Sequence, residues 1–204
     1  MSDRRKAAAM TAQAPVAPLS DEALMARVAA ADRDAFAMLV ERHVARHVAL
    51  AGRILGAAGD AEDVVQDAFL SVWRQARGYD STRAAFATWL YRIVVNRCLD
   101  AKRKRKGTML PLALAAAAVD QGPRPDQAAA GRSDAAAVRA ALDALPPRQR
   151  AALVLVYYEG LSNREAAKVL DVGVKGLESL LVRARQRLRE TLAPLADDLN
   201  GNWD

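Results

Sequence analysis

The chain has 204 residues and a formal net charge of +6, with 30 lysines and arginines against 24 aspartates and glutamates. This length suits one or two compact domains, and the basic balance favours a polyanionic partner. The single cysteine, Cys98, excludes an intramolecular disulfide and a zinc site built from cysteines. Alanine, leucine, arginine and glutamate dominate and β-branched runs are short, which predicts an all-α protein.

The N-terminal segment, residues 1–19, consists mainly of alanine, proline, serine and charged residues. We expect it to be disordered because it offers almost nothing large to bury. Gln13 and Pro15 stand where the apolar core of a signal peptide would lie, which argues against one. No apolar run is long enough to span a bilayer. We therefore expect a cytoplasmic protein with no direct membrane insertion.

Helices are predicted from Ser20 onward, since a serine cap is followed there by acidic residues. Two amphipathic segments follow, separated around Asp32, and the second ends at Gly56. His43 and His47 lie four residues apart in that segment, a spacing that can bind a metal. No third ligand is nearby and the intervening residues lack a catalytic glutamate, so a structural or surface pair is favoured over a metal site.

The next helix is predicted over residues 60–74, with Asp60 able to cap it. Apolar residues from Val64 to Trp73 keep helical spacing. That spacing leaves a polar face outside, which includes Asp63, Gln66 and Asp67. From the residues alone, this face is most simply a solvated surface.

A long amphipathic helix is predicted over residues 83–106, ending in five consecutive cations, Lys102 to Lys106. Cys98 falls on its apolar side, where a small buried thiol is expected. A second side carries an aromatic ring, two guanidinium groups and an amide in one stripe: Trp89, Arg92, Asn96 and Arg103. These groups can stack on a base, bond its edge and hold phosphates. Core packing is an equal explanation for Trp89, and a run of cations is usually only a solvated helix end.

Residues 107–133 contain three prolines and no aromatic residue, and are predicted to be a flexible linker. Helices resume near Asp134, with a break at Pro146 and Pro147. The C-terminal residues 193–204 are expected to form a loose tail. The sequence therefore predicts two small helical domains, over residues 20–106 and 134–192, on a tether.

Residues 162–189 predict two helices joined by a tight turn at Gly173, with four arginines near the end of the second. Ser162 and Glu165 have the spacing of a capping box. This pattern is typical of a helix-turn-helix unit whose second helix enters a major groove. An ordinary helical hairpin with a solvated charged face is the alternative.

The sequence contains no convincing catalytic motif. It has no phosphate-cradling glycine loop, no nucleophile motif and no cysteine–histidine set. We therefore predict a protein that is not an enzyme and that uses no cofactor or metal.

Three segments in order resemble the extracytoplasmic-function group of the sigma-70 family of bacterial RNA polymerase sigma factors. They are DAEDVVQDAFLSVWR (60–74), FATWLYRIVVNRCLD (86–100) and ALPPRQRAALVLVYYEGLSNREAAKVLDVGV (144–174). The resemblance covers about residues 20–192. It implies that the first domain is region 2, which binds core polymerase and opens the −10 element, and that the second is region 4, which recognises the −35 element.

The resemblance also implies roles for individual residues. Asp63, Gln66 and Asp67 match the contact with the β′ clamp coiled coil of polymerase, whose β flap is a further expected partner. The family's −10 recognition matches the loop 79–86 and the helix behind it, which carries the stripe Trp89, Arg92, Asn96 and Arg103. A base drawn from the duplex would sit in a pocket near that loop, with Asn96 the best candidate to recognise its edge.

Region 4 departs from the family pattern at two positions. Where the recognition helix usually carries cations beside a serine, this chain has Glu178 and Leu180. The remaining candidate −35 contacts are Lys175, Ser179, Arg183 and Arg185, with Arg183 preferred. Glu178 can accept a hydrogen bond from a cytosine amino group or pair with a cation of its own helix. We expect DNA binding with an altered −35 preference.

Members of this group are commonly held inactive by an anti-sigma protein, so the resemblance implies such a partner. Two other functions stay open at this point. One is a stand-alone helix-turn-helix regulator, which leaves the 60–106 pattern unexplained. The other is a protein-only sigma mimic or anti-sigma antagonist, in which the cations at 102–106 and 183–189 would have no purpose.

Overall fold

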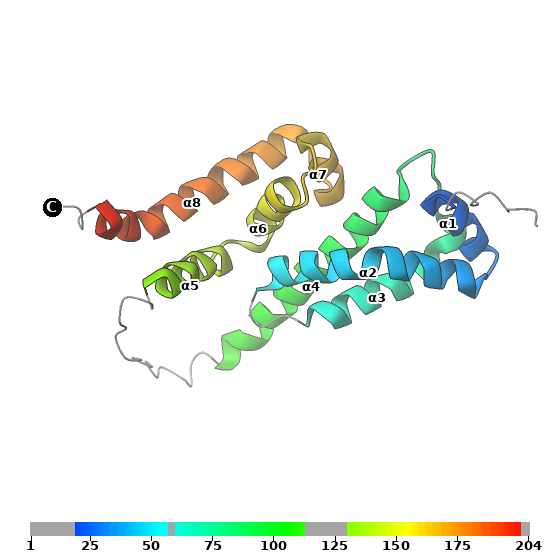
Figure 1. Cartoon of the computed structure of the whole chain (residues 1–204), viewed down its shortest axis with the longest axis horizontal. Coiled ribbons are helices and arrows are strands. Elements are labelled where there is room, and N and C mark those ends of the chain that lie inside the picture. The colour runs from blue at the N-terminus through cyan, green and yellow to red at the C-terminus, as the bar shows by residue number, and fades with distance from the viewer. Residues whose placement is uncertain (1–18, 57–59, 113–129, 201–204) are drawn as a thin grey trace, which may run out of the picture.

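The computed structural model describes residues 19–56, 60–112 and 130–200, and within these ranges every regular element is helical (Figure 1). This confirms the predicted all-α fold. The expected N-terminal disorder and most of the expected linker fall outside the described residues. Within these ranges, none of the helices combines the length and the apolar character needed to cross a bilayer.

The first half of the chain forms four α-helices and a short 3-10 turn. Their bounds are α1 (Asp21–Ala29), α2 (Arg33–Leu55), α3 (Ala61–Gln75), η1 (Ala76–Gly78) and α4 (Phe86–Leu112). The predicted starts of α1 and α2 are confirmed: Ser20 Oγ accepts the Ala23 N–H at 3.1 Å and Asp32 Oδ1 accepts the Ala35 N–H at 3.0 Å. These bonds satisfy amide donors that have no partner inside the helix.

The second half contains four α-helices and one π-helical segment. Their bounds are α5 (Ala130–Asp143), α6 (Pro147–Leu153), η3 (Val154–Tyr158), α7 (Asn163–Leu170) and α8 (Val174–Asn200). As predicted from the two prolines, α6 begins at Pro147, where a missing N–H costs no helical hydrogen bond.

Three local predictions were wrong. α4 continues past residue 106 to Leu112, and α8 continues through the predicted tail to Asn200. In the tail, Leu192, Leu195 and Leu199 keep the apolar spacing of a helix, which outweighs the single proline. Asp60 precedes α3 but makes no capping bond; its carboxylate instead accepts from Arg105 Nη2 at 2.7 Å.

The core of the first half lies where α2 packs against α1, α3 and α4. Its large, fully buried side chains include Leu24, Met25, Leu39, Leu50, Ile54, Val65, Val72, Phe86 and Leu90. Cys98 is also completely buried, as predicted, and burial raises the pKa of its thiol to about 12.

The two histidines of α2 have structural partners. His43 Nε2 lies 2.7 Å from Asp21 Oδ2, and His47 Nδ1 lies 2.8 Å from the His43 carbonyl oxygen. His47 is buried, and burial lowers its pKa from 6.5 to about 4 because the charged ring would lose its hydration. The structural interpretation of the pair fits these contacts.

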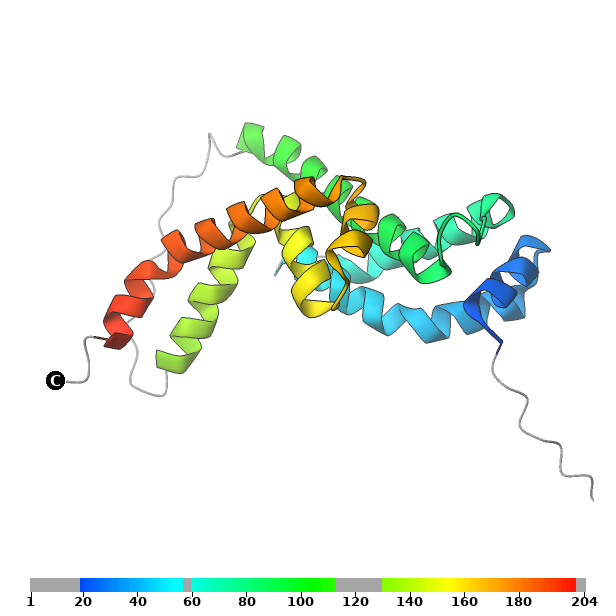
Figure 2. The ribbon, with the colours of Figure 1, turned by 90° about the horizontal axis from the view of Figure 1, so that it is seen from above.

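The two halves pack against each other, although the sequence predicted independent domains on a tether. α6 and α7 lie along α4, and η3 and α6 contact α2 (Figures 1 and 2). Buried residues of both halves belong to one continuous apolar cluster, in which Tyr91 of α4 and Leu155 of η3 take part. This arrangement places the helix-turn-helix beside the long basic helix.

We expect His47 to make the free energy of unfolding depend on pH. The unfolded chain binds the His47 proton at a higher pH than the folded chain does. Stability should therefore fall by about 1 kcal/mol per pH unit as the pH drops from 6.5 toward about 4.

Denaturant unfolding of the wild type and of His47→Asn across this pH range checks the expectation. The asparagine amide stands where Nδ1 does but does not titrate. The variant should lose this part of the pH dependence, and an unchanged dependence would contradict the assignment.

Candidate nucleic-acid interface

A surface cavity of about 300 Å³ lies between α3 and α4. Three residues of the predicted stripe, Trp89, Arg92 and Asn96, line it together. Arg103 is not among the lining residues; it lies two turns further along α4 and is strongly exposed. The structure thus brings three of the four predicted −10 residues into one hollow of suitable chemistry.

Trp89 is half-buried, and its ring is fixed by its neighbours. Its centroid lies 5.0 Å from that of Tyr79 and 6.2 Å from that of Phe86. Tyr79 is itself anchored, since its hydroxyl donates to the Ala84 carbonyl at 3.1 Å. Trp89 therefore packs against the core with one part and lines the cavity with another, which combines the two explanations considered for it.

Polar residues that sequence reasoning missed complete the cavity. Arg97 Nη2 donates to Ser71 Oγ at 2.8 Å, and the Ser71 hydroxyl donates to the Asp67 carbonyl at 2.9 Å. Gln75 lines the same hollow. Ser71 falls within the apolar stripe of α3 and Arg97 directly follows Asn96, so only the packing of α3 against α4 reveals their proximity.

The run of cations after the cavity is partly neutralised within the fold. Arg103 pairs with Asp100 at 2.6 Å and Arg105 pairs with Asp60 at 2.7 Å. These two guanidinium groups therefore have carboxylate partners within the fold. The run is more than a uniform solvated helix end.

The polar face of α3 is exposed, as its spacing predicted. Asp63, Gln66 and Asp67 are all exposed, whereas Val65, Ala68 and Val72 on the other side are buried against α2 and α4. Two carboxylates and an amide thus stand on one outward surface, a suitable contact for a basic partner.

The predicted capping box begins α7. Ser162 Oγ accepts the Glu165 N–H at 3.3 Å, and a Glu165 carboxylate oxygen accepts the Ser162 N–H at 2.9 Å. The capping hydrogen bonds also lower the pKa of Glu165. α7 ends at Asp171, whose backbone adopts the left-handed conformation with φ of 54°. The chain then turns through Gly173 into α8, which confirms the predicted helix-turn-helix.

The first turns of α8 present Lys175, Glu178 and Ser179 to solvent. These positions suit a recognition helix, whose N-terminal residues contact base edges. No described contact pairs Glu178 with a cation of its own helix, and its carboxylate stands on the outward face.

Arg183 and Arg185 are both exposed but lie on opposite flanks of α8, because residues two apart in an α-helix are separated by about 200°. Arg183 lines a groove of about 460 Å³ that α8 forms with α5, together with Gln186 and Arg187. The structure therefore does not bring all five predicted −35 residues onto one face.

Two family descriptions match the two halves of the chain. Sigma-70 region 2 matches residues 39–108 and Sigma-70 region 4 matches residues 135–188. A curated relative from Mycobacterium tuberculosis, the ECF RNA polymerase sigma factor SigM, is 39% identical over 182 residues, covering 89% of each chain. The ECF RNA polymerase sigma-E factor of Escherichia coli is 32% identical over 188 residues, covering 87% of this chain and 96% of the relative. The chain belongs to the extracytoplasmic-function group of the sigma-70 family.

Solved structures agree with this assignment. CnrH in complex with the cytosolic domain of CnrY aligns with a TM-score of 0.62 and 31% identity, covering 85% of this chain and 97% of CnrH. RpoE from Bartonella quintana, solved with the anti-sigma factor NepR, aligns with a TM-score of 0.58 and 26% identity, covering 78% of this chain and 96% of RpoE.

The family assignment identifies the first half of the chain as region 2 and the second half as region 4. The cavity between α3 and α4 lies in region 2, and the helix-turn-helix formed by α7 and α8 lies in region 4. Sigma factors are DNA-binding regulatory proteins.

Proposed function

We propose that this sigma factor binds core RNA polymerase and gives it promoter specificity, with region 2 opening the −10 element and region 4 recognising the −35 element. The observation that carries the proposal is the α3–α4 cavity. It sets an aromatic ring, a guanidinium group and an amide around one hollow of a sigma region 2. Those groups can stack on an unpaired base, hold its phosphate and bond its edge.

Asn96 is the residue proposed to recognise the base. It is exposed at the cavity, and its amide offers both a donor and an acceptor. Trp89 supplies a stacking surface worth about 1–3 kcal/mol per base, while Arg92 and Arg103 hold phosphates. Unpairing costs a few kcal/mol per base, so one or two captured bases offset the opening of a short bubble.

For region 4, we propose that the N-terminal turns of α8 enter the major groove. Lys175, Glu178 and Ser179 would contact base edges, and Glu178 would accept from a cytosine amino group. Arg183 and Arg185, on opposite flanks, would then hold the phosphates on the two sides of the groove. This assignment makes Glu178 a determinant of −35 preference.

Core polymerase would be held by the exposed face of α3. Asp63, Gln66 and Asp67 offer acidic and amide groups to the β′ clamp coiled coil, with the β flap as a further contact for region 4. An anti-sigma protein is also proposed as a partner, because RpoE was solved in complex with the anti-sigma factor NepR.

Run-off transcription on genomic fragments, with purified core polymerase, tests the proposed function. Transcripts that appear only when the chain is added, from sites that share two spaced elements, are the expected result. Stable polymerase binding without transcripts would favour a sigma mimic. DNA binding without polymerase binding would favour a stand-alone regulator.

We expect Asn96→Ala to reduce open-complex formation by roughly tenfold, the effect of losing about 1.4 kcal/mol of base contact. Binding of core polymerase should stay near the wild-type level, because Asn96 lies outside the α3 face. Permanganate footprinting of the −10 region and a polymerase pull-down check the two expectations. A loss of polymerase binding would make Asn96 a structural residue instead.

The double variant Gln66→Ala, Asp67→Ala should bind core polymerase several-fold more weakly with an unchanged melting temperature, since both side chains are exposed. Glu41→Ala, which removes an exposed carboxylate from α2 instead, should bind normally. Equal binding by the double variant and the wild type would remove the α3 face from the polymerase contact.

A further inference from the structure

The contact between regions 2 and 4 is centred on the carboxylate of Glu159, which follows η3. Its side chain is only 4% exposed. It accepts hydrogen bonds from Arg46 Nε at 2.9 Å and from the Tyr91 hydroxyl at 2.8 Å, and Arg53 Nη1 lies at 3.4 Å. All three donors belong to region 2, and we refer to them as the Glu159 socket.

The socket is built for a carboxylate. The Arg46 guanidinium also reaches the Glu159 carbonyl at 3.3 Å and lies 5.5 Å above the Tyr91 ring. The carboxylate raises the pKa of Arg46, and burial together with the same carboxylate raises the pKa of Tyr91. Arg53 lies 5.3 Å above the ring of Tyr158, so it contacts region 4 twice.

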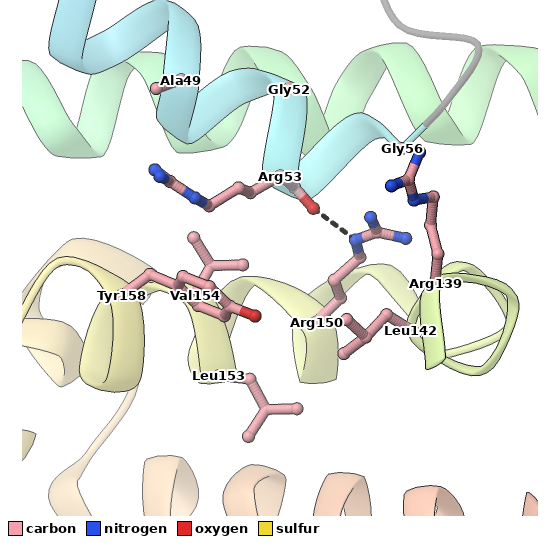
Figure 3. Close-up of a pocket in the computed structure, with 10 residues that line it drawn as sticks. All are labelled: Ala49, Gly52, Arg53, Gly56, Arg139, Leu142, Arg150, Leu153, Val154 and Tyr158. Atoms are coloured by element: carbon pink, nitrogen blue, oxygen red, sulfur yellow. Dashed lines mark hydrogen bonds between the residues drawn. The ribbon is translucent and has the colours of Figure 1, made fainter. Parts of the chain in front are cut away.

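A second contact lies beside the socket, at the end of α2. Arg150 of α6 is 5% exposed, pairs with Asp143 of its own half and donates to the Arg53 carbonyl of region 2 (Figure 3). A surface cleft of about 430 Å³ opens beside this contact, lined by Arg53 of region 2 and by Leu142, Val154 and Tyr158 of region 4. The two regions therefore leave this edge of their interface open to solvent.

A third contact joins the two surfaces that are proposed to bind the promoter. Arg92 of the −10 stripe pairs with Asp171 at 3.2 Å, and Asp171 is the residue that ends α7. The turn before the recognition helix is therefore held against the cavity that would receive the −10 base.

We propose that the Glu159 socket is a docking surface for region 4, and that occupation by Glu159 holds the free sigma factor closed, in a state that cannot span a promoter. This inference rests on the proposed function. The −10 and −35 elements, named for their positions, lie about 25 base pairs apart, or about 85 Å of B-form DNA. In the closed state the −35 candidates on α8 begin four residues after Asp171 and extend only about 15 Å along the helix.

The closed state can be released without unfolding either region. Arg46 and Arg53 are 57% and 43% exposed, so salt screens their attraction to Glu159. The α3 face proposed for polymerase lies outside the socket, which is formed by α2 and α4. Polymerase can therefore engage the closed protein first, and separation of region 4 then releases Arg92 from Asp171 and frees α8 to reach the −35 element.

Small-angle scattering of the full-length free chain tests the socket. Glu159→Gln, which removes the charge and keeps the shape, should raise the open-to-closed ratio about tenfold and increase the radius of gyration. Arg46→Gln should act in the same direction and lies on the surface, so it leaves the folding of both regions intact. Glu190→Gln removes a matched charge from the exposed part of α8 and should leave the closed state unchanged.

Run-off transcription at limiting amounts of each variant tests the consequence of closure. Glu159→Gln and Arg46→Gln should be at least as active as the wild type. Unchanged scattering of both variants would overturn the socket, whether or not transcription occurs. A larger radius of gyration together with less transcription than the wild type gives would contradict the proposal that closure inhibits the protein. A wild type that is closed but yields no transcripts would refute the proposed function and leave the socket standing.

Discussion

Burying a carboxylate is costly unless donors replace the water that it loses, and in this protein the donors for Glu159 come from the other region. Arg46, Arg53 and Tyr91 provide them from α2 and α4. The requirement is directional, because a slide of region 4 along α4 would leave the carboxylate without its donors. A non-directional apolar contact alone would not fix the arrangement in this way. In the same arrangement α7 packs against α4, and Arg92 pairs with Asp171.

The docking of region 4 through Glu159 leaves some proposed contact surfaces exposed and engages others. The acidic face of α3 and the first turns of α8 are exposed in the docked arrangement, whereas Arg92 is engaged by region 4. A sigma factor built in this way presents its proposed polymerase contact at all times and completes its promoter contacts only after the regions part. The partly exposed arginines of the socket keep that step reversible.

Local signals in the sequence predicted the parts of the fold that depend on local chemistry. The caps at Ser20 and Ser162 and the turn at Gly173 were recognisable because a helix terminus needs specific donors and acceptors. The exposed face of α3 followed from helical spacing. Helical spacing also predicted that Trp89, Arg92 and Asn96 share one side of α4, where they line one cavity, although their contacts with DNA stay predictions.

The sequence contains no local pattern that predicts contacts between residues far apart in the chain. Arg97 meets Ser71 and Arg46 meets Glu159 only after separate helices pack, and these partners stand 26 and 113 residues apart. Glu159 lies beside a glycine that ends a helix, where an acidic side chain is ordinarily solvated. The tether between the halves suggested independent domains, because composition describes the linker and not the surfaces that it allows to meet. For the same reason the position of Arg183 in a groove between α5 and α8 became clear only once these helices had packed.

The closed state of the free chain is tested most directly by measuring the distance between regions 2 and 4 in single molecules, before and after assembly on a promoter. Fluorophores on cysteines introduced at Ala37 and Asn163, both exposed, would report it, while buried Cys98 stays unlabelled because its thiol has a pKa of about 12. We predict one short distance between the fluorophores in the free wild-type chain, and a much longer distance when core polymerase and promoter DNA are bound. An equally long distance in the free chain, or a short one retained on the promoter, would contradict it.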